Sequence, residues 1–179
     1  MTSLNRYERK KNIPLALKAC ADFMKRNEKE TNVKFEDQDT VLVVAGGWDP
    51  RVAENVAHEK ELRALAKELK ITDKVVFLKS ISNDQRLLLL ENTKVLLYTP
   101  ENEHFGIVPV EAMHMGCIVM ACNSGGPLES VAHGETGYLQ PPEPALWGEK
   151  IHDLLGNDLT PAENDAKIAQ MKKAAKQRV

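Results

Sequence analysis

The sequence predicts a doubly wound, Rossmann-like α/β domain built on a parallel sheet. Short β-branched runs alternate along the chain with longer segments of helical periodicity. The apolar runs are continuous, which is typical of strands covered on both faces and joined by crossover helices. The chain has 179 residues, of which 42% are hydrophobic and 28% charged, and this suits one globular domain with a sizeable core.

The first elements follow from local patterns. Apolar residues recur at helical spacing between Ile13 and Met24, with Pro14 in the first turn of this predicted helix. We expect the polar stretch 26–39 to form a loop. The continuous apolar run from Thr40 to Ala45 predicts a strand that ends in Gly46 and Gly47.

The later elements repeat the alternation. A second amphipathic helix is marked by Leu62, Leu65, Ala66 and Leu69. Residues 82–85 read Ser-Asn-Asp-Gln, a capping box that opens the helix carrying four consecutive leucines up to Leu90. Three further strands are predicted at residues 74–78, 95–98 and 118–121.

Both ends of the sequence predict that it is one piece of a longer protein. Ser3 and Leu4 resemble the end of a strand whose beginning is almost absent. Residues 157–179 predict a polar helix, rich in Lys and Ala, with little to pack against.

Composition excludes several classes of function. A formal net charge of -2 argues against a large nucleic-acid surface. No apolar run approaches the roughly 20 residues that span a bilayer, and the N-terminus lacks the apolar core of a signal peptide. Cys20, Cys117 and Cys122 stand among apolar residues and are interpreted as reduced core residues, not a redox pair.

Polar residues gather where the predicted strands end. In open parallel sheets, ligands bind beyond the carboxyl ends of the strands. Those ends are rich in Gly, Asn, Ser or charged residues at most of the predicted strands, in the segments 5–6, 46–47, 99–105 and 123–126. We therefore expect a polar ligand at this edge.

The densest of these segments runs from Thr99 to Glu111. Pro109 suits the first turn of a helix, so the helix is predicted to begin near Gly106. Free N–H groups around Phe105, Gly106, Ile107 and Val108 would then form an anion site, and glycine would let a phosphate approach the backbone.

Two acids flank that helix start. Glu111, just over one turn in, could accept both hydroxyls of a ribose, as acidic residues do in dinucleotide sites. Glu103 precedes the helix and is suited to the hydroxyls of a sugar attached to the phosphate. The alternative interpretation is a helix-capping acid and a solvated one.

A basic turn follows the first strand. Arg6 and Lys11 lie five residues apart, so both could reach one diphosphate and neutralise it as a leaving group without a metal. A solvated basic turn is the alternative, and it is the interpretation adopted for Arg9 and Lys10.

Other candidates carry less information. Gly46 and Gly47 could contact a ligand or serve only as a turn. Ser124 and Gly125 are predicted to start a helix and could also contact a ligand. Asp37 and Asp39 resemble an Asp-x-Asp metal motif but precede a strand, so they are interpreted as part of a solvated loop. The remaining histidines outside the dense loop have no metal-ligand spacing, and no metal site is expected: His58, His114, His133 and His152.

Together these motifs resemble the C-terminal domain of retaining GT-B glycosyltransferases of family four. The resemblance rests on Glu103-x7-Glu111 with the embedded Phe105 and Gly106, on Arg6-x4-Lys11, and on the segment 124–127, Ser-Gly-Gly-Pro. It covers nearly the whole chain. The family often has Gly where this chain has Asn5, so the turn must tolerate a side chain.

Three segments, 5–12, 45–49 and 102–109, resemble eukaryotic mannosyltransferases of this family that assemble dolichol-linked oligosaccharide. The resemblance implies a GDP-mannose donor, a lipid-linked oligosaccharide acceptor in N-glycosylation, and work at the cytosolic face of the endoplasmic reticulum. It also implies that Arg6 and Lys11 hold the diphosphate, Glu111 the ribose and Glu103 the transferred sugar.

Residues 1–179 are then the nucleotide-sugar-binding domain, with the N-terminal acceptor domain and any membrane-contacting segments lying outside the sequence. Alone, it is expected to bind donor weakly and to catalyse nothing. Alternatives are a non-catalytic relative, a domain for UDP-sugars, and an NAD-type oxidoreductase domain. The last would need Gly-x-Gly-x-x-Gly after the first strand, where this chain has Asn-Arg-Tyr-Glu-Arg-Lys.

Overall fold

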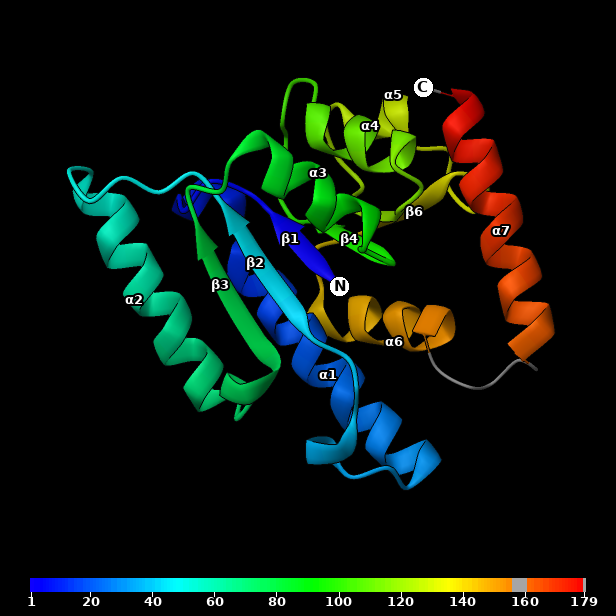
Figure 1. The fold of residues 1–179 in the computed structure, drawn as a ribbon, viewed down its shortest axis with the longest axis horizontal. Coiled ribbons are helices and arrows are strands. Elements are labelled where there is room, and N and C mark those ends of the chain that lie inside the picture. The colour runs from blue at the N-terminus through cyan, green and yellow to red at the C-terminus, as the bar shows by residue number, and fades with distance from the viewer. Residues whose placement is uncertain (156–160, 179) are drawn as a thin grey trace.

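The computed structural model describes residues 1–155 and 161–178. Within these ranges it contains a six-stranded sheet in the order β3-β2-β1-β4-β5-β6, and all paired strands run parallel (Figure 1). The strands are β1 (Thr2–Leu4), β2 (Leu42–Gly46), β3 (Val75–Lys79), β4 (Val95–Tyr98), β5 (Ile118–Cys122) and β6 (Gly137–Gln140). The predicted doubly wound α/β fold is confirmed.

The α-helices are α1 (Ile13–Thr31), α2 (Ala53–Glu68), α3 (Asn83–Glu91), α4 (Ile107–His114), α5 (Pro127–Ser130), α6 (Pro144–Leu155) and α7 (Pro161–Arg178). Helices α1 to α5 connect successive strands, and α6 and α7 follow β6. Short 3-10 helices lie at Arg9–Lys11, Phe35–Asp37 and Thr72–Lys74. The capping box of α3 forms as predicted, because the Gln85 N–H donates to Ser82 Oγ and the Ser82 N–H donates to Gln85 Oε1.

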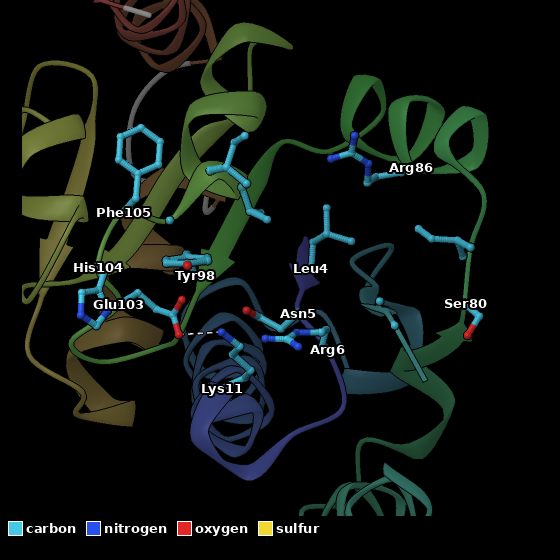
Figure 2. A pocket seen from close by; sticks show the side chains of 16 residues that line it. Leu4, Asn5, Arg6, Lys11, Ser80, Arg86, Tyr98, Glu103, His104 and Phe105 are labelled. Atoms are coloured by element: carbon cyan, nitrogen blue, oxygen red, sulfur yellow. Dashed lines mark hydrogen bonds and ion pairs between the residues drawn. The ribbon is translucent and has the colours of Figure 1, made fainter. Parts of the chain in front are cut away.

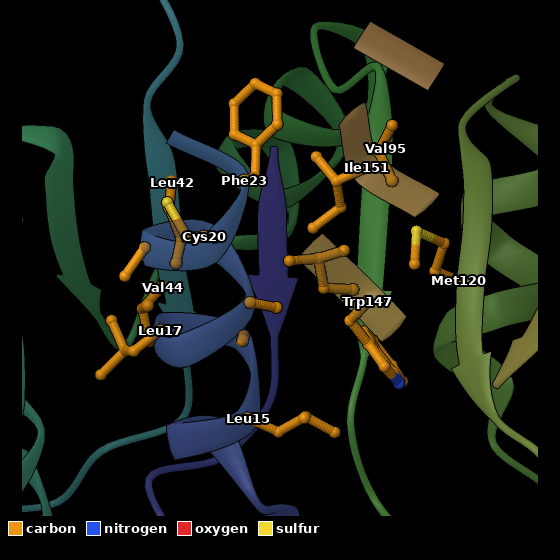
Figure 3. Close-up of a cluster of buried hydrophobic side chains, with 14 of the residues drawn as sticks. Leu15, Leu17, Cys20, Phe23, Leu42, Val44, Val95, Met120, Trp147 and Ile151 are labelled. Carbon is orange, nitrogen blue, oxygen red and sulfur yellow. The ribbon is translucent and has the colours of Figure 1, made fainter. Parts of the chain in front are cut away.

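The two faces of the sheet bury different helices, since side chains alternate across a strand. Leu42 and Val44 of β2 face the core formed with α1, α2 and α6, which Figure 3 shows around Trp147 and Phe23. Ala45 faces the second core, formed with α3 and α4. Trp147 and Phe23 are almost fully buried, and burying a side chain of this size contributes about 2–3 kcal/mol.

The strand order creates a crevice between β1 and β4. Connections run to one side of β1 in the first half of the chain and to the other side in the second half. Thr2 pairs with Leu96, and no later β1–β4 pair follows among the described residues, whereas β1 pairs with β2 along its whole length. The two strands therefore leave an opening at their carboxyl ends, where such sheets bind ligands.

Two segments differ from expectation. Helix α1 continues to Thr31, so the loop predicted from residue 26 was wrong over that stretch; Arg26 pairs with Asp22 at 2.5 Å one turn earlier. A solvated final turn needs no apolar stripe, and periodicity could not detect it. Strand β6 and helix α6 had no counterpart among the predicted elements.

Helix α7 is better packed than its composition indicated. Met171 and Ala175 are buried, and Arg178 donates to the carbonyl oxygens of Ser130 and Glu129 at 2.8 and 2.9 Å. The expectation that this helix has little to pack against was wrong, because Met171 and Ala175 are enough to pack one side of it against the domain. Of the predicted helix 157–179, residues 157–160 and 179 lie outside the described residues.

Among residues 1–155 and 161–178, no helix combines the length and apolar character that crossing a bilayer requires.

Candidate functional site

A cavity of about 540 Å³ lies at the carboxyl edge of the sheet (Figure 2). This volume is within the usual range for small-molecule sites. Its lining comes from the ends of β1, β2, β3 and β4 and from the starts of α3 and α4: Leu4, Asn5, Arg6, Lys11, Gly46, Gly47, Ser80, Ile81, Arg86, Tyr98, Glu103, His104, Phe105, Gly106, Ile107 and Val108.

One end of the cavity holds an ion pair. Lys11 Nζ lies 2.6 Å from Glu103 Oε1, and only 9% of the lysine side chain is exposed (Figure 2). The backbone around it is fixed as well, because Thr99 Oγ1 donates to the Lys11 carbonyl oxygen at 2.7 Å and Asn12 Nδ2 donates to Glu101 Oε1 at 3.1 Å. The sequence motifs predicted separate roles for Lys11 and Glu103, and in the structure the two side chains form an ion pair.

The start of α4 opens into the same cavity. Gly106 caps this helix with φ of 74°, a left-handed conformation that favours glycine, and no side chain caps it. The first N–H groups of a helix have no partner within it, so they are available to an anion. Beside it stands Tyr98, whose pKa is raised to about 12 by burial and by the nearby Glu103 carboxylate.

Arg6 also lines the cavity, on the turn after β1. Its Nη1 lies 3.0 Å from Glu8 Oε1, and 60% of its side chain is exposed. Arg9 and Lys10 do not line the cavity: Arg9 pairs with Glu61 and Lys10 with Glu8 on the solvated side. The predicted division of the basic turn therefore matches the geometry.

Glu111 lies on α4 just over one turn from its start, as predicted, and its carboxylate is paired within the protein. It does not line the cavity, and its Oε2 accepts from Nη1 of Arg86 on α3. Both side chains are partly buried, with 29% of Arg86 and 26% of Glu111 exposed. Sequence reasoning missed Arg86, although it lies four residues after the predicted cap Ser82 and so at the same edge.

The glycine candidates have structural roles in addition to any ligand contact. A Cβ on Gly46 would lie 2.0 Å from the Asn5 carbonyl oxygen, so β1 and β2 approach closely there. Gly47 borders the cavity beside the Arg6 side chain. Both glycines are therefore placed at the site, as the sequence predicted, with Gly46 fixed by packing.

Ser124 and Gly125 lie behind the Glu103 loop and not on the cavity wall. Ser124 Oγ accepts from the Asn102 N–H at 3.1 Å, and the Gly126 N–H donates to the Glu103 carbonyl oxygen at 2.7 Å. A Cβ on Gly125 would lie 2.3 Å from that same oxygen. The segment supports the loop that carries Glu103.

The remaining predicted residues lie elsewhere. The 3-10 helix ending at Asp37 precedes β2, at the amino end of the strand and away from the cavity. Within the described ranges, no group of three or more His, Cys, Asp or Glu residues is arranged to hold a metal ion. All the cysteines are free and buried, and burial raises the pKa of Cys117 and Cys122 to about 11 and 12, which disfavours thiolate chemistry.

Residues 1–178 match the family model described as "Glycosyl transferases group 1". The chain belongs to this family of glycosyltransferases. The predicted resemblance is thereby confirmed over nearly the whole sequence.

Curated relatives in the family are named alpha-1,3/1,6-mannosyltransferase ALG2. The chain is 47% identical to the one from Homo sapiens over 156 residues, covering 87% of this chain and 36% of that protein. It is 48% identical to the one from Dictyostelium discoideum over 157 residues, covering 88% and 37%. The chain thus spans little more than a third of the length of these relatives.

Solved structures of GT-B glycosyltransferases share the fold. A sucrose-phosphate synthase from Thermosynechococcus elongatus superposes with a TM-score of 0.79 at 24% identity, covering 99% of this chain and 40% of that one. The C-terminal domain of the group 1 family protein LpcC from Francisella tularensis superposes with a TM-score of 0.76 at 19% identity, covering 99% and 83%. This chain has the fold of one half of a GT-B enzyme.

Proposed function

We propose that this chain is the donor-binding domain of a retaining mannosyltransferase that uses GDP-mannose to elongate the dolichol-linked oligosaccharide precursor of N-glycosylation. The observation that carries the proposal is the Lys11–Glu103 pair at the start of α4, inside a cavity of ligand size. The names of the curated relatives support the mannosyltransferase class.

The cavity has the charges that a nucleoside diphosphate requires. Lys11, Arg6 and the free N–H groups at the start of α4 converge on one region, where they would bind the diphosphate and stabilise it as a leaving group. This positive field comes from the protein itself, so the proposal includes no metal ion.

Glu103 would contact the mannose. Its carboxylate is held by Lys11, and its exposed part faces the cavity beside His104 (Figure 2). A carboxylate at this place can accept hydrogen bonds from sugar hydroxyls and stabilise positive charge that develops on the sugar as the diphosphate leaves.

The acceptor would bind opposite this cavity. The relatives are more than twice as long as this chain, and we assign the lipid-linked oligosaccharide and any membrane contact to the part of the protein outside residues 1–179. In the cell this would place the cavity at the cytosolic face of the endoplasmic reticulum. Nucleic acid has no role in the proposal.

Titration of this chain with GDP, GDP-mannose, UDP and NAD, followed through backbone amide signals, tests the proposal. We expect GDP and GDP-mannose to bind and to shift signals around Arg6, Glu103 and Gly106. Preference for UDP would instead indicate a UDP-sugar domain. Preference for NAD, or signals that move at the amino edge of the sheet, would contradict the proposal.

A further inference from the structure

Arg86 lies in the cavity but has no role in the family motif or in the proposed chemistry. It occupies the first turn and a half of α3, and the Ser82–Gln85 capping box fixes where that helix begins. In Figure 2 it stands on the opposite side of the cavity from Glu103 and His104. The site therefore has a second charged end.

The pairing of Arg86 leaves most of its donors free. A guanidinium carries five N–H donors in a planar fork. In the described part of the chain, the one hydrogen bond that this guanidinium makes is the donation from Nη1 to Glu111. Glu111 thus restrains one side of the group, and the other donors are available to a ligand in the cavity.

The walls near Arg86 suit a flat heterocycle. Leu4 and Ile81 supply apolar surface to the lining. Ser80 borders this end (Figure 2), and its hydroxyl is engaged with the Trp48 backbone, donating to the carbonyl oxygen and accepting from the N–H. If the diphosphate lies at the start of α4 and the sugar at Glu103, the base must occupy this remaining end.

We infer that Arg86 selects the nucleobase, donating to the adjacent O6 and N7 acceptors of guanine while Glu111 holds it in place. This inference rests on the proposed function. Guanine presents two adjacent acceptors, O6 and N7, to a guanidinium fork. Adenine replaces O6 with an amino donor, and the O4 acceptor of uracil has no second acceptor beside it.

The experiment measures affinities of this chain for GDP, IDP, ADP, UDP and pyrophosphate by NMR titration. IDP keeps O6 and N7 but lacks the 2-amino group, so it isolates the acceptor pair. We expect the unaltered chain to bind GDP and IDP alike, and ADP and UDP at least about tenfold more weakly.

Two variants of Arg86 distinguish a role in base selection from a role in positioning Glu111. Arg86→Met removes charge and donors, and we expect GDP and IDP to fall about tenfold to the level of ADP, with pyrophosphate affinity unchanged. Arg86→Lys keeps a cation for Glu111 but loses the fork, so the preference for GDP over ADP is lost there too. Arg51→Met, at an arginine that is 88% exposed and outside the cavity, is the matched control and changes nothing.

Each other result overturns the inference. An equal fall for all nucleotides in Arg86→Met, rescued by Arg86→Lys, means that Arg86 only positions Glu111. A fall for pyrophosphate means that Arg86 binds phosphate, and an unaltered GDP-to-ADP ratio in a folded variant rules out base selection. If the unaltered chain binds neither GDP nor pyrophosphate, the proposed function fails with it.

Discussion

The two ends of the cavity are built in different ways. At the end proposed for the sugar, the loop that carries Glu103 is held by three contacts: the Gly126 N–H donates to it, Gly125 packs against it, and the largely buried Lys11 pairs with Glu103. At the end proposed for the nucleoside, the side-chain pair Arg86 and Glu111 links α3 to α4. A carboxylate that stabilises charge developing during the reaction, as proposed for Glu103, benefits from a rigid backbone. A side chain that recognises a base, as inferred for Arg86, can be held in place by another side chain.

The largest expected effect tests the rigid end. Gly125→Ala places a Cβ 2.3 Å from the Glu103 carbonyl oxygen at φ of 62°, so the loop must move, and we expect a loss of about 3 kcal/mol in the free energy of unfolding. Gly134→Ala is the control, since its φ of 82° brings the same strain with nothing within 4 Å, and we expect about 1 kcal/mol. Denaturant unfolding measures both, and equal losses would show that the contact at Gly125 is unimportant.

The next effect concerns the buried pair. Lys11→Met leaves Glu103 partly buried without its cation, and we expect about 2 kcal/mol of lost stability together with weaker GDP binding. Lys10→Met, at a lysine whose side chain is 65% exposed, is expected to cost almost nothing. Unfolding and GDP titration of both variants measure these losses. If the two variants lost the same stability, the rigid end would not depend on this ion pair.

A smaller effect separates the two acids. We expect Glu111→Ala to weaken the binding of GDP and GDP-mannose alike by about 1.5 kcal/mol. The variant loses the charged carboxylate that accepts a hydrogen bond from Arg86 at the end proposed for the nucleoside. Glu103→Ala is expected to leave GDP affinity nearly unchanged and, in the full-length enzyme, to lower turnover more than donor binding. Calorimetry and kinetics measure these differences. The reverse pattern would exchange the roles of the two ends.

The smallest effect is that of metal removal. Because Lys11, Arg6 and the start of α4 supply positive charge, we expect a chelator of divalent ions to change GDP affinity less than about twofold. The measurement is GDP titration with and without chelator. A large loss of GDP affinity in chelator would make Asp37 and Asp39 candidate metal ligands again.

Features encoded by neighbouring residues were predicted well. The capping box at Ser82, the helix start at Gly106 and the continuous strands each depend on a few consecutive side chains, and the structure has all of them. The convergence of Arg6, Lys11 and Glu103 could also be predicted, because parallel strands end at one edge and the family motif names the residues.

Contacts between distant segments were decided by tertiary structure alone. The pairing of Glu111 with Arg86 depends on how α3 packs beside α4. No local sequence pattern specifies the distance between these two helices. In sequence, Ser124 and Gly125 indicate a helix start that could contact a ligand, and in the structure they pack closely against the loop that carries Glu103. The sequence determined which side chains reach the carboxyl edge of the sheet, and packing between elements far apart in the chain determined which of them touch, since those distances are set by buried volume rather than by spacing along the chain.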